Sequence, residues 1–407
     1  MNVADDSAPK GPLSGYRVLD LTTMVSGPIS TMMLADQGAD VIKVEPLRGE
    51  TMRNAGIKHR GMSSSFLSCN RNKRSLAIDL KRPEGLDAVR RLLPSCDVVV
   101  QNFRPGAIER MGLGLEVARA ARPDIIFVSI SGFGEEGPYA GQRVYDPVIQ
   151  ALCGLADIQR DRDSGEPRMV RTIIPDKTTS VTAAQAITAA LLHRERFGEG
   201  QHIKLAMLDT MVAYLWPESS SGLNYVGNEV DPARAQMGLD LIFKTLDGYI
   251  TAATVADAEW RGFCRAVDRP DMLEDPRFAS ATQRSAHQTE RRKFMSDAVS
   301  GYASADVIAR LRTEDVPCAP VYTREQLMRD EQVLKNGIIE QHEHPVIGPV
   351  RQPRPAVRFE KTPANIRSLA PYLGEHNADI LRDAGLSEAD IAALAEAGVT
   401  AAETPGG

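Results

Sequence analysis

Residues 16–28 read YRVLDLTTMVSGP and set the pattern for the first third of the chain. The apolar positions within residues 16–21 predict a buried strand. Ser26-Gly27-Pro28 predicts the start of a helix, with Ser26 as the N-cap and Pro28 in the first turn. Residues 40–44, DVIKV, predict a second strand. A helix between two buried strands is typical of a βαβ unit, so this segment predicts a parallel sheet.

The same alternation continues along the chain. Residues 83–93 predict a helix with one apolar face, and residues 98–100 and 125–130 predict further strands. The expected fold class is therefore α/β, with a mostly parallel sheet. Because ligands of such sheets bind at the carboxyl ends of the strands, functional residues are expected in the loops that follow them.

The pattern changes beyond residue 232. Residues 242–246 and 249–253 flank Asp247-Gly248, which predicts a β-hairpin. Three helices are predicted to follow, over residues 256–267, 288–299 and 305–312. These elements indicate a separate α+β domain. Residues 345–354 are rich in proline and predict a linker, and Ser387 with Asp390 predicts a capping box in a helical tail.

Bulk composition narrows the function class. The length of 407 residues predicts two or three domains, and the 43% hydrophobic and 25% charged residues are ordinary for a soluble globular protein. A net charge of −6 argues against a general nucleic-acid surface. The cysteines are scattered without CxxC spacing, which predicts neither a zinc site nor a disulfide framework and favours a reducing, cytoplasmic compartment. Residues 1–10 lack the apolar core of a signal peptide, and no apolar run is long enough for a membrane span.

Residues 132–137, GFGEEG, match the G-x-G-x-x-G pattern after a predicted strand. A dinucleotide site would require a long helix to begin at once, but Pro138 and Gly141 follow. The motif also closes a late strand and does not open the first βαβ unit. A glycine-rich active-site loop or a plain turn therefore remains the better interpretation.

Several basic residues fall at predicted loop positions. Taken singly, each is a typical solvated surface charge, but a parallel sheet would gather such residues around an anion. Together they predict a phosphate-bearing ligand. They are Arg48, Arg71, Lys73, Arg74, Lys81, Arg104, Arg110 and Arg143.

Asp176 is the candidate for the chemistry. It follows the apolar residues 173–175 and precedes a hydroxyl cluster, residues 178–180, and a helix predicted over 181–196. A carboxylate held in a partly dry position at the mouth of a helix can act as a nucleophile. The alternative is that Asp176 only caps the helix. No Ser-His-Asp, Cys-His or metal-ligand grouping emerges from the spacing, so a carboxylate beside a phosphate-rich ligand is the remaining constellation.

A series of segments resembles one known family. They include "LSGYRVLDLT", "GADVIKVEP", "NRNKRSLAIDLK", "QNFRPGAIERMG", "SGFGEEGPY", "YDPVIQA", "GEGQHIKLAMLD" and "LGEH". In this order and spacing the chain resembles the class III CoA-transferases, also called the CaiB/BaiF family, which include formyl-CoA transferase and carnitine CoA-transferase.

The resemblance implies a large Rossmann-like domain built from both ends of the chain and a smaller middle domain. It also implies a homodimer whose subunits are interlocked like linked rings. The implied boundaries are residues 1–216 for the N-terminal part of the large CoA-binding domain, 217–232 for a linker, 233–335 for the small α+β domain, 336–354 for a second linker and 355–407 for the C-terminal part of the large domain.

The resemblance also implies the site residues. Asp176 occupies the position of the family's catalytic aspartate. Arg48 is offset from a CoA-contacting arginine of the family, because Pro46 stands at the aligned place. The positions that match the family's CoA site are Thr23, Met24, Val25, Ser26, Arg48, Ile78, Lys81, Asn102, Phe103, Arg110, Arg143 and Tyr145.

The implied activity is transfer of CoA from an acyl-CoA thioester to a carboxylic acid, through aspartyl anhydride and aspartyl-CoA thioester intermediates. Acyl-CoA and the acid are the expected partners, with no permanently bound cofactor, no metal, no nucleic acid and no membrane. Two alternatives stay open. An α-methylacyl-CoA racemase of the same fold would carry a His-Asp pair where this chain has Tyr145-Asp146, and tyrosine is a poor base because its pKa is about 10. A non-catalytic CoA- or nucleotide-binding protein would use Asp176 only as a cap.

The middle domain departs from the formyl-CoA transferase pattern. That enzyme has a run of glycines that closes over its site, and residues 254–261 here have no such run. Oxalate is therefore not the expected acceptor. Trp260, Arg261 and Met237 are candidates for an acyl pocket, with the alternative that Trp260 belongs to the core of the small domain.

Overall fold

A computed structural model describes residues 11–161, 163–217, 219–230 and 241–403 of the chain. These residues form two compact units. The larger unit comprises residues 11–161, 166–216 and 337–403, so both ends of the chain contribute to it. The smaller unit comprises residues 163–165 and the described residues between 217 and 336. Residues 1–10, for which the sequence analysis predicts no signal peptide, lie outside the described residues.

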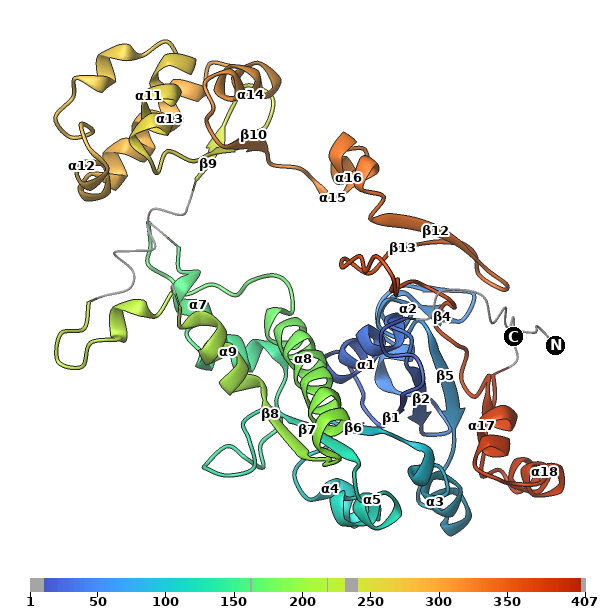
Figure 1. The fold of residues 1–407 in the computed structure, drawn as a ribbon. Coiled ribbons are helices and arrows are strands. Elements are labelled where there is room, and N and C mark those ends of the chain that lie inside the picture. Colours follow the sequence, from blue (N-terminus) through green and yellow to red (C-terminus); the bar gives the residue numbers. More distant parts are fainter. Residues whose placement is uncertain (1–10, 162, 218, 231–240, 404–407) are drawn as a thin grey trace. The chain divides into compact units, whose positions relative to one another are not determined.

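The larger unit is built on a 6-stranded parallel sheet, which confirms the predicted fold class (Figure 1). The strand order reverses direction between β1 and β6, so the topological switch point lies there. In sheet order the strands are β5 (Lys73–Ala77), β2 (Asp40–Glu45), β1 (Arg17–Asp20), β6 (Val98–Gln101), β7 (Ile126–Ser131) and β8 (His202–Ala206).

Both faces of this sheet are buried, because alternate residues of each strand point to opposite sides. Val18 and its parallel neighbours pack with residues of α1 (Ser26–Asp36) and α8 (Ile174–Phe197), which run side by side in Figure 1. Leu19 and its neighbours pack on the other side with residues of α3 (Pro83–Arg90), α5 (Leu115–Ala121), α17 (Asn377–Asp383) and α18 (Glu388–Glu396). The near-continuous apolar strands of the sequence follow from this double cover.

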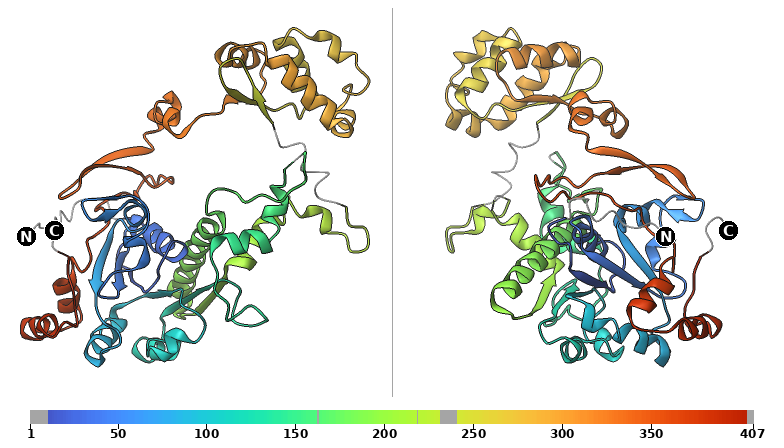
Figure 2. Two further views of the ribbon diagram at one scale, coloured as in Figure 1. Left: turned by 180° about the vertical axis from the view of Figure 1, so that it is seen from behind. Right: turned by 45° about the vertical axis from the view of Figure 1, so that its right-hand side comes forward.

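The sequence analysis missed strand β5 and placed Lys73 and Arg74 in a loop. Lys73 is 2% exposed, because its ammonium lies 2.9 Å from the Asp20 carboxylate of β1. A strand that begins with two basic residues shows no apolar alternation, so its pattern was hidden. The outer edge of β5 is covered by the C-terminal part of the chain: the Asn377 side chain accepts a hydrogen bond from the Ala77 N–H at 2.9 Å. Figure 2 shows the red C-terminal helices beside the blue strands.

Two local expectations were wrong. Ser26 is the first residue of α1 and not its N-cap, a position held by Val25 without a side-chain cap. Residues 345–354 are not a linker, because β12 (Ile339–His344) and β13 (Gly348–Pro353) form an antiparallel hairpin there. Proline misled the prediction, since a two-stranded ribbon leaves the outer edge of each strand unpaired and tolerates proline. The predicted capping box of Ser387 and Asp390 is confirmed at the start of α18.

The smaller unit has its own core. The predicted hairpin is confirmed as β9 (Ile242–Lys244) and β10 (Tyr249–Ala252), joined to β11 (Cys318–Pro320). Its helices α11 (Asp257–Ala266), α13 (Gln288–Val299) and α14 (Ser304–Thr313) match the three predicted ones. Trp260 is 2% exposed and packs against three phenylalanines, so it belongs to the core and not to an acyl pocket. Arg261 is exposed, and Met237 lies outside the described residues.

Short elements complete the described chain. None of the described helices is long and apolar enough to cross a membrane. The remaining elements are η1 (Thr51–Arg53), β3 (Lys58–His59), β4 (Met62–Ser63), α2 (Ser64–Cys69), η2 (Leu93–Ser95), α4 (Ala107–Arg110), α6 (Asp146–Leu152), α7 (Leu155–Ile158), α9 (Met207–Leu215), η3 (Ser221–Leu223), η5 (Pro270–Leu273), α12 (Ala281–Ala286), α15 (Arg324–Leu327) and α16 (Glu331–Asn336).

Candidate active site

Asp176 lies in the first turn of α8, whose N-cap position is Ile173. It is therefore not the N-cap, and the sequence prediction that the helix starts near residue 181 was too late by about two turns. Pro175 in the same turn fits because the first helical N–H groups have no intrahelical partner. A carboxylate in this turn also faces the positive end of the helix dipole, which favours its charged form.

Asp146 anchors the backbone of this turn. It is 4% exposed, and its Oδ2 accepts the Asp176 N–H at 3.2 Å. Its Oδ1 accepts a hydrogen bond from the Gln150 side chain at 2.6 Å, one turn further along α6. Gln150 in turn is tied to the segment before α8, since its Oε1 accepts the Val170 N–H at 2.9 Å. Two buried side chains thus fix the entry to α8.

The Asp176 side chain meets the start of α1. Burial raises the pKa of Asp176 to about 6, and the negative charge of Asp146 adds to this effect. Hydrogen bonds from the side chain and the backbone N–H of Ser26 act in the opposite direction, because they favour the carboxylate. The group is therefore mostly ionised near neutral pH yet more basic than an ordinary aspartate, which suits a nucleophile.

The switch point joins two of the predicted CoA-binding segments. The Thr23 N–H donates to Asn102 Oδ1 at 2.9 Å, and Asn102 Nδ2 donates to the Thr23 carbonyl at 2.8 Å. These two hydrogen bonds tie the loop after β1 to the loop after β6. The structure thereby brings together Thr23, Met24, Val25, Ser26, Asn102 and Phe103 at the edge of the sheet that carries Asp176.

The other predicted CoA-binding residues follow strands at the same edge or lie near it. Ile78 is buried directly after β5, with Lys81 exposed three residues later, and Arg48 is exposed after β2. Arg110 is exposed at the end of α4. Arg143 and Tyr145 are exposed in the connection from β7 to α6, and the Tyr145 side chain is 65% exposed.

Three of the basic residues do not fit the predicted anion site. Arg71 pairs with Asp36 at 2.7 Å, Lys73 with Asp20 at 2.9 Å and Arg74 with Asp40 at 2.6 Å. These cations neutralise carboxylates of the protein itself. The remaining members of the set, Arg48, Lys81, Arg104, Arg110 and Arg143, are exposed.

The glycine-rich loop is not a dinucleotide fingerprint. Gly134 and Gly137 both have a φ of 88°, and no helix begins until Asp146. The Gly134 N–H donates to Ser131 Oγ at 3.0 Å, which closes a tight turn after β7. A side chain at position 132 would collide with Val144, because a Cβ there would lie 2.3 Å from it. These glycines therefore shape the path from β7 to α6.

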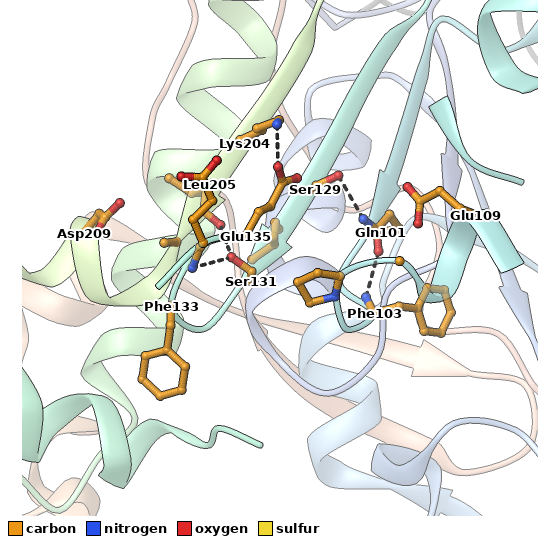
Figure 3. A pocket seen from close by; sticks show the side chains of 16 residues that line it. Gln101, Phe103, Glu109, Ser129, Ser131, Phe133, Glu135, Lys204, Leu205 and Asp209 are labelled. Carbon is orange, nitrogen blue, oxygen red and sulfur yellow. Dashed lines mark hydrogen bonds and ion pairs between the residues drawn. The ribbon is translucent and has the colours of Figure 1, made fainter. Parts of the chain in front are cut away.

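A cavity of about 360 Å³ opens at the carboxyl ends of β6, β7 and β8 (Figure 3). Phe103 is the one predicted CoA-binding residue in its lining, and its N–H donates to Gln101 Oε1 at 2.8 Å. Lys204 on the opposite wall pairs with Glu135. Asp176 does not line this cavity, so the nucleophile candidate is identified by its position in the first turn of α8 and by its raised pKa.

The sequence analysis gave no structural role to Asp146, which anchors the start of α8, or to Glu50, which pairs with the buried Lys43. Their roles depend on partners far away in the chain, and no local periodicity predicts them. One signal was available, since Lys43 and Glu45 interrupt an otherwise apolar strand. Charged residues in a buried strand require partners, and here they belong to a network that also holds Glu50.

The larger unit is thus a Rossmann-like parallel sheet with a half-buried carboxylate, Asp176, in the first turn of α8. Comparison with known families is specific: the family described as CoA-transferase family III matches residues 13–377. The chain belongs to this family and is a CoA-transferase, with acyl-CoA and carboxylate substrates.

Individual relatives agree. The chain is 35% identical to the succinate–glutarate CoA-transferase of Agrobacterium fabrum over 390 residues, which covers 92% of this chain and 96% of the relative. It is 33% identical to the human succinyl-CoA:glutarate CoA-transferase, covering 91% and 86% of the two chains. A crystal structure of a CaiB/BaiF family protein from Brucella suis superimposes with a TM-score of 0.81 at 31% identity, covering 92% of this chain and 100% of that one.

Proposed function

We propose that Asp176 is the nucleophile of the transfer reaction. The observation that carries this assignment is its position in the first turn of α8, where Asp146 accepts its backbone N–H and burial raises its pKa to about 6. The carboxylate attacks the thioester carbonyl of the donor and forms a mixed anhydride, while CoA leaves as the thiolate. The thiolate then attacks the aspartyl carbonyl, which gives an aspartyl-CoA thioester and releases the donor acid.

The second half reverses these steps with the acceptor. The acceptor carboxylate attacks the aspartyl-CoA carbonyl, forms a second mixed anhydride and expels the thiolate. The thiolate attacks the acceptor's acyl carbonyl, and Asp176 returns as a carboxylate. No proton is gained or lost over the cycle, so no general base is required. The residues that bind substrate need only orient CoA and shield the anhydride from water.

CoA binds across the switch point in this proposal. The loop from Thr23 to Ser26 and the pair Asn102 and Phe103 hold the middle of the ligand, since two hydrogen bonds join these loops. Lys81, Arg110 and Arg143 are the proposed partners of the phosphates. Replacing each by alanine should weaken CoA binding by about 1.5–3 kcal/mol. The residue that serves the 3′-phosphate should show a smaller loss with dephospho-CoA, as measured by calorimetry.

The proposed substrates are succinyl-CoA as donor and a dicarboxylic acid of four or five carbons as acceptor. This rests on the relatives, which are named for succinate, glutarate, citramalate and mesaconate at 32–35% identity. The protein needs no resident cofactor in this scheme. We further propose that it acts as an interlocked homodimer in the cytoplasm.

The experiment compares Asp176→Asn and Asp176→Ala with the parent. Parent enzyme incubated with succinyl-CoA alone should gain the mass of a CoA adduct, which peptide mapping places on Asp176 and hydroxylamine removes. Both variants should lack the adduct and should transfer no CoA to glutarate. Asp379→Asn is the matched control, because Asp379 also lies in the first turn of a helix, α17, but its side chain is 68% exposed. Transfer at the parent rate by Asp176→Asn would refute the assignment.

A further inference from the structure

The loop after β1 contains an unusual backbone conformation. Met24 has a φ of 68°, in the left-handed region that side chains other than glycine rarely adopt. The residue lies two positions before Ser26, the first residue of α1. Helix α1 packs against α8, and the hydroxyl and N–H of Ser26 lower the pKa of Asp176. A methionine in this conformation persists only where its surroundings hold it.

Glu50 stabilises this conformation of Met24 through a hydrogen bond. Its Oε2 accepts the Met24 N–H at 2.7 Å, and the residue is 3% exposed. A buried carboxylate that accepts a backbone N–H makes a strong, short hydrogen bond. Glu50 reaches this loop from the start of η1, well separated from β1 in the sequence. The contact therefore ties the loop to a second part of the sheet's carboxyl edge.

Lys43 supports Glu50 and the same loop. Its ammonium lies 2.8 Å from Glu50 Oε1, and both side chains are fully buried. The same ammonium donates to the Thr22 carbonyl at 3.0 Å. Lys43 therefore binds the loop at Thr22, and Glu50 binds it at Met24. Burial lowers the pKa of Lys43, but Asp20, Glu50 and Glu45 outweigh this and raise it to about 12. The lysine is thus a fixed cation.

We propose that Glu50 is a positioning residue of the transfer reaction, which holds Met24 in the left-handed conformation and thereby keeps the start of α1, at Ser26, in place beside Asp176. This inference rests on the proposed role of Asp176. The competing explanation is that the ion pair only stabilises the fold. The two explanations differ in the rate they predict for folded protein. A positioning role predicts a slower chemical step in folded Glu50 variants, whereas a purely stabilising role predicts the parent rate.

The test measures formation of the aspartyl-CoA adduct in a single turnover with saturating succinyl-CoA. Glu50→Ala should slow the step by about 10- to 100-fold in protein that is still folded by circular dichroism, since small misplacements of reacting groups have effects of this size. Glu50→Gln keeps an oxygen that can accept the Met24 N–H and should be affected less. If Glu50→Ala is too unstable to fold, Glu50→Asp, which withdraws the carboxylate from Met24, takes its place with the same expectation.

A rescue variant separates positioning from stability. Glycine adopts the left-handed conformation without penalty, so adding Met24→Gly to Glu50→Ala should restore the rate several-fold. Asp97→Asn is the control for a lost buried ion pair, because Asp97 lies at the amino end of β6, on the opposite edge of the sheet, and pairs with Arg194. It should lower stability without slowing adduct formation.

Three results would overturn the inference: adduct formation at the parent rate in folded Glu50→Ala, an equal slowing in Asp97→Asn, or no rescue by Met24→Gly. Peptide mapping keeps this outcome apart from failure of the proposed function. If Glu50→Ala forms the adduct on Asp176 at the parent rate, only the positioning role of Glu50 is refuted. An adduct on another residue removes the role of Asp176 itself.

Discussion

Asp176 carries a negative charge that its surroundings disfavour, and this has a thermodynamic consequence. Its pKa is raised from 3.8 to about 6 by burial and by Asp146, so the folded protein binds a proton that the unfolded chain has already lost. Stability is therefore lost as pH rises from about 4 to about 6. Asp176→Asn should raise the free energy of unfolding by about 1–3 kcal/mol at pH 8 and by less at pH 5. Urea unfolding at both pH values measures this, and the exposed Asp379→Asn should change by less than about 0.5 kcal/mol.

The same pKa governs the first chemical step. In the proposed mechanism only the carboxylate form of Asp176 attacks the thioester, so the rate of adduct formation should rise with pH and level off above about 6. Asp146→Asn keeps an oxygen for the Asp176 N–H but removes the negative charge. The midpoint of its pH profile should therefore lie below that of the parent. Rapid-quench measurements from pH 4.5 to 8 test this, and an unshifted midpoint would rule out Asp146 as a cause of the raised pKa.

Tyr145 distinguishes transfer from racemisation. A racemase must remove the α-proton of its acyl-CoA, and the tyrosine is 65% exposed with no histidine base in its place. Incubation of the parent with 2-methylacyl-CoA in heavy water should give no α-deuterium by mass spectrometry. Fast incorporation without an acceptor acid would move the protein to the isomerases.

For single residues, the sequence predicts Asp176 as the nucleophile candidate but does not predict the residues that position it or shift its pKa. Asp176 stands out because of its neighbours and the family resemblance. Asp146 and Glu50 act through partners 30 and 26 positions away, and such pairings have no periodic signature. Ser26 was predicted as an N-cap because serine is common there, but it is the first residue of α1 and lowers the pKa of Asp176.

Among the elements, apolar strands and long helices were predictable and β5 was not. Runs of aliphatic residues in the sequence predict β2, β6 and β7, and these residues are buried in the structure. β5 begins with Lys73 and Arg74, whose charges are neutralised only after the sheet has formed. The hairpin β12–β13 was hidden by proline in the same way. Local pattern fails where an element depends on a distant partner.

Lys73 should therefore be important for the joining of β5 to the sheet. Its pair with Asp20 is fully buried, and the lysine also donates to the Pro28 carbonyl of α1 at 2.8 Å. Lys73→Met leaves Asp20 with one cationic neighbour fewer and should cost about 3–5 kcal/mol in the free energy of unfolding. Burial raises the pKa of Asp20, but Lys73 and Lys43 hold it well below its usual range, so this contribution is present at neutral pH and is lost in acid.

The comparison variant is Arg91→Met, which breaks the exposed pair with Asp87 on α3. Exposed pairs contribute about 1 kcal/mol or less, so its midpoint in urea should barely move. If Lys73→Met unfolds at the same urea concentration as Arg91→Met, the buried pair does not secure β5.

For the whole molecule, the prediction concerns the proposed interlocked homodimer. Subunits that pass through each other cannot separate while both remain folded, so dilution should not dissociate them. Mass photometry at nanomolar protein should show the dimer alone. Subunit exchange between tagged and untagged protein should occur only after unfolding in denaturant. A dilution-dependent monomer population would contradict interlocking.

The larger unit is completed by residues that follow the smaller unit in the sequence, and this sets an order of events during translation. The Ala401 N–H donates to the Ala77 carbonyl at 3.2 Å, and Ile78 bridges to Thr400. While the ribosome still holds these residues, β5 lacks its cover and its edge is open to other chains. The smaller unit has nearly all of its residues earlier, between 217 and 336. The unit that starts first is therefore finished only after the smaller unit has been made, and the edge of β5 stays open until residues 400 and 401 have left the exit tunnel.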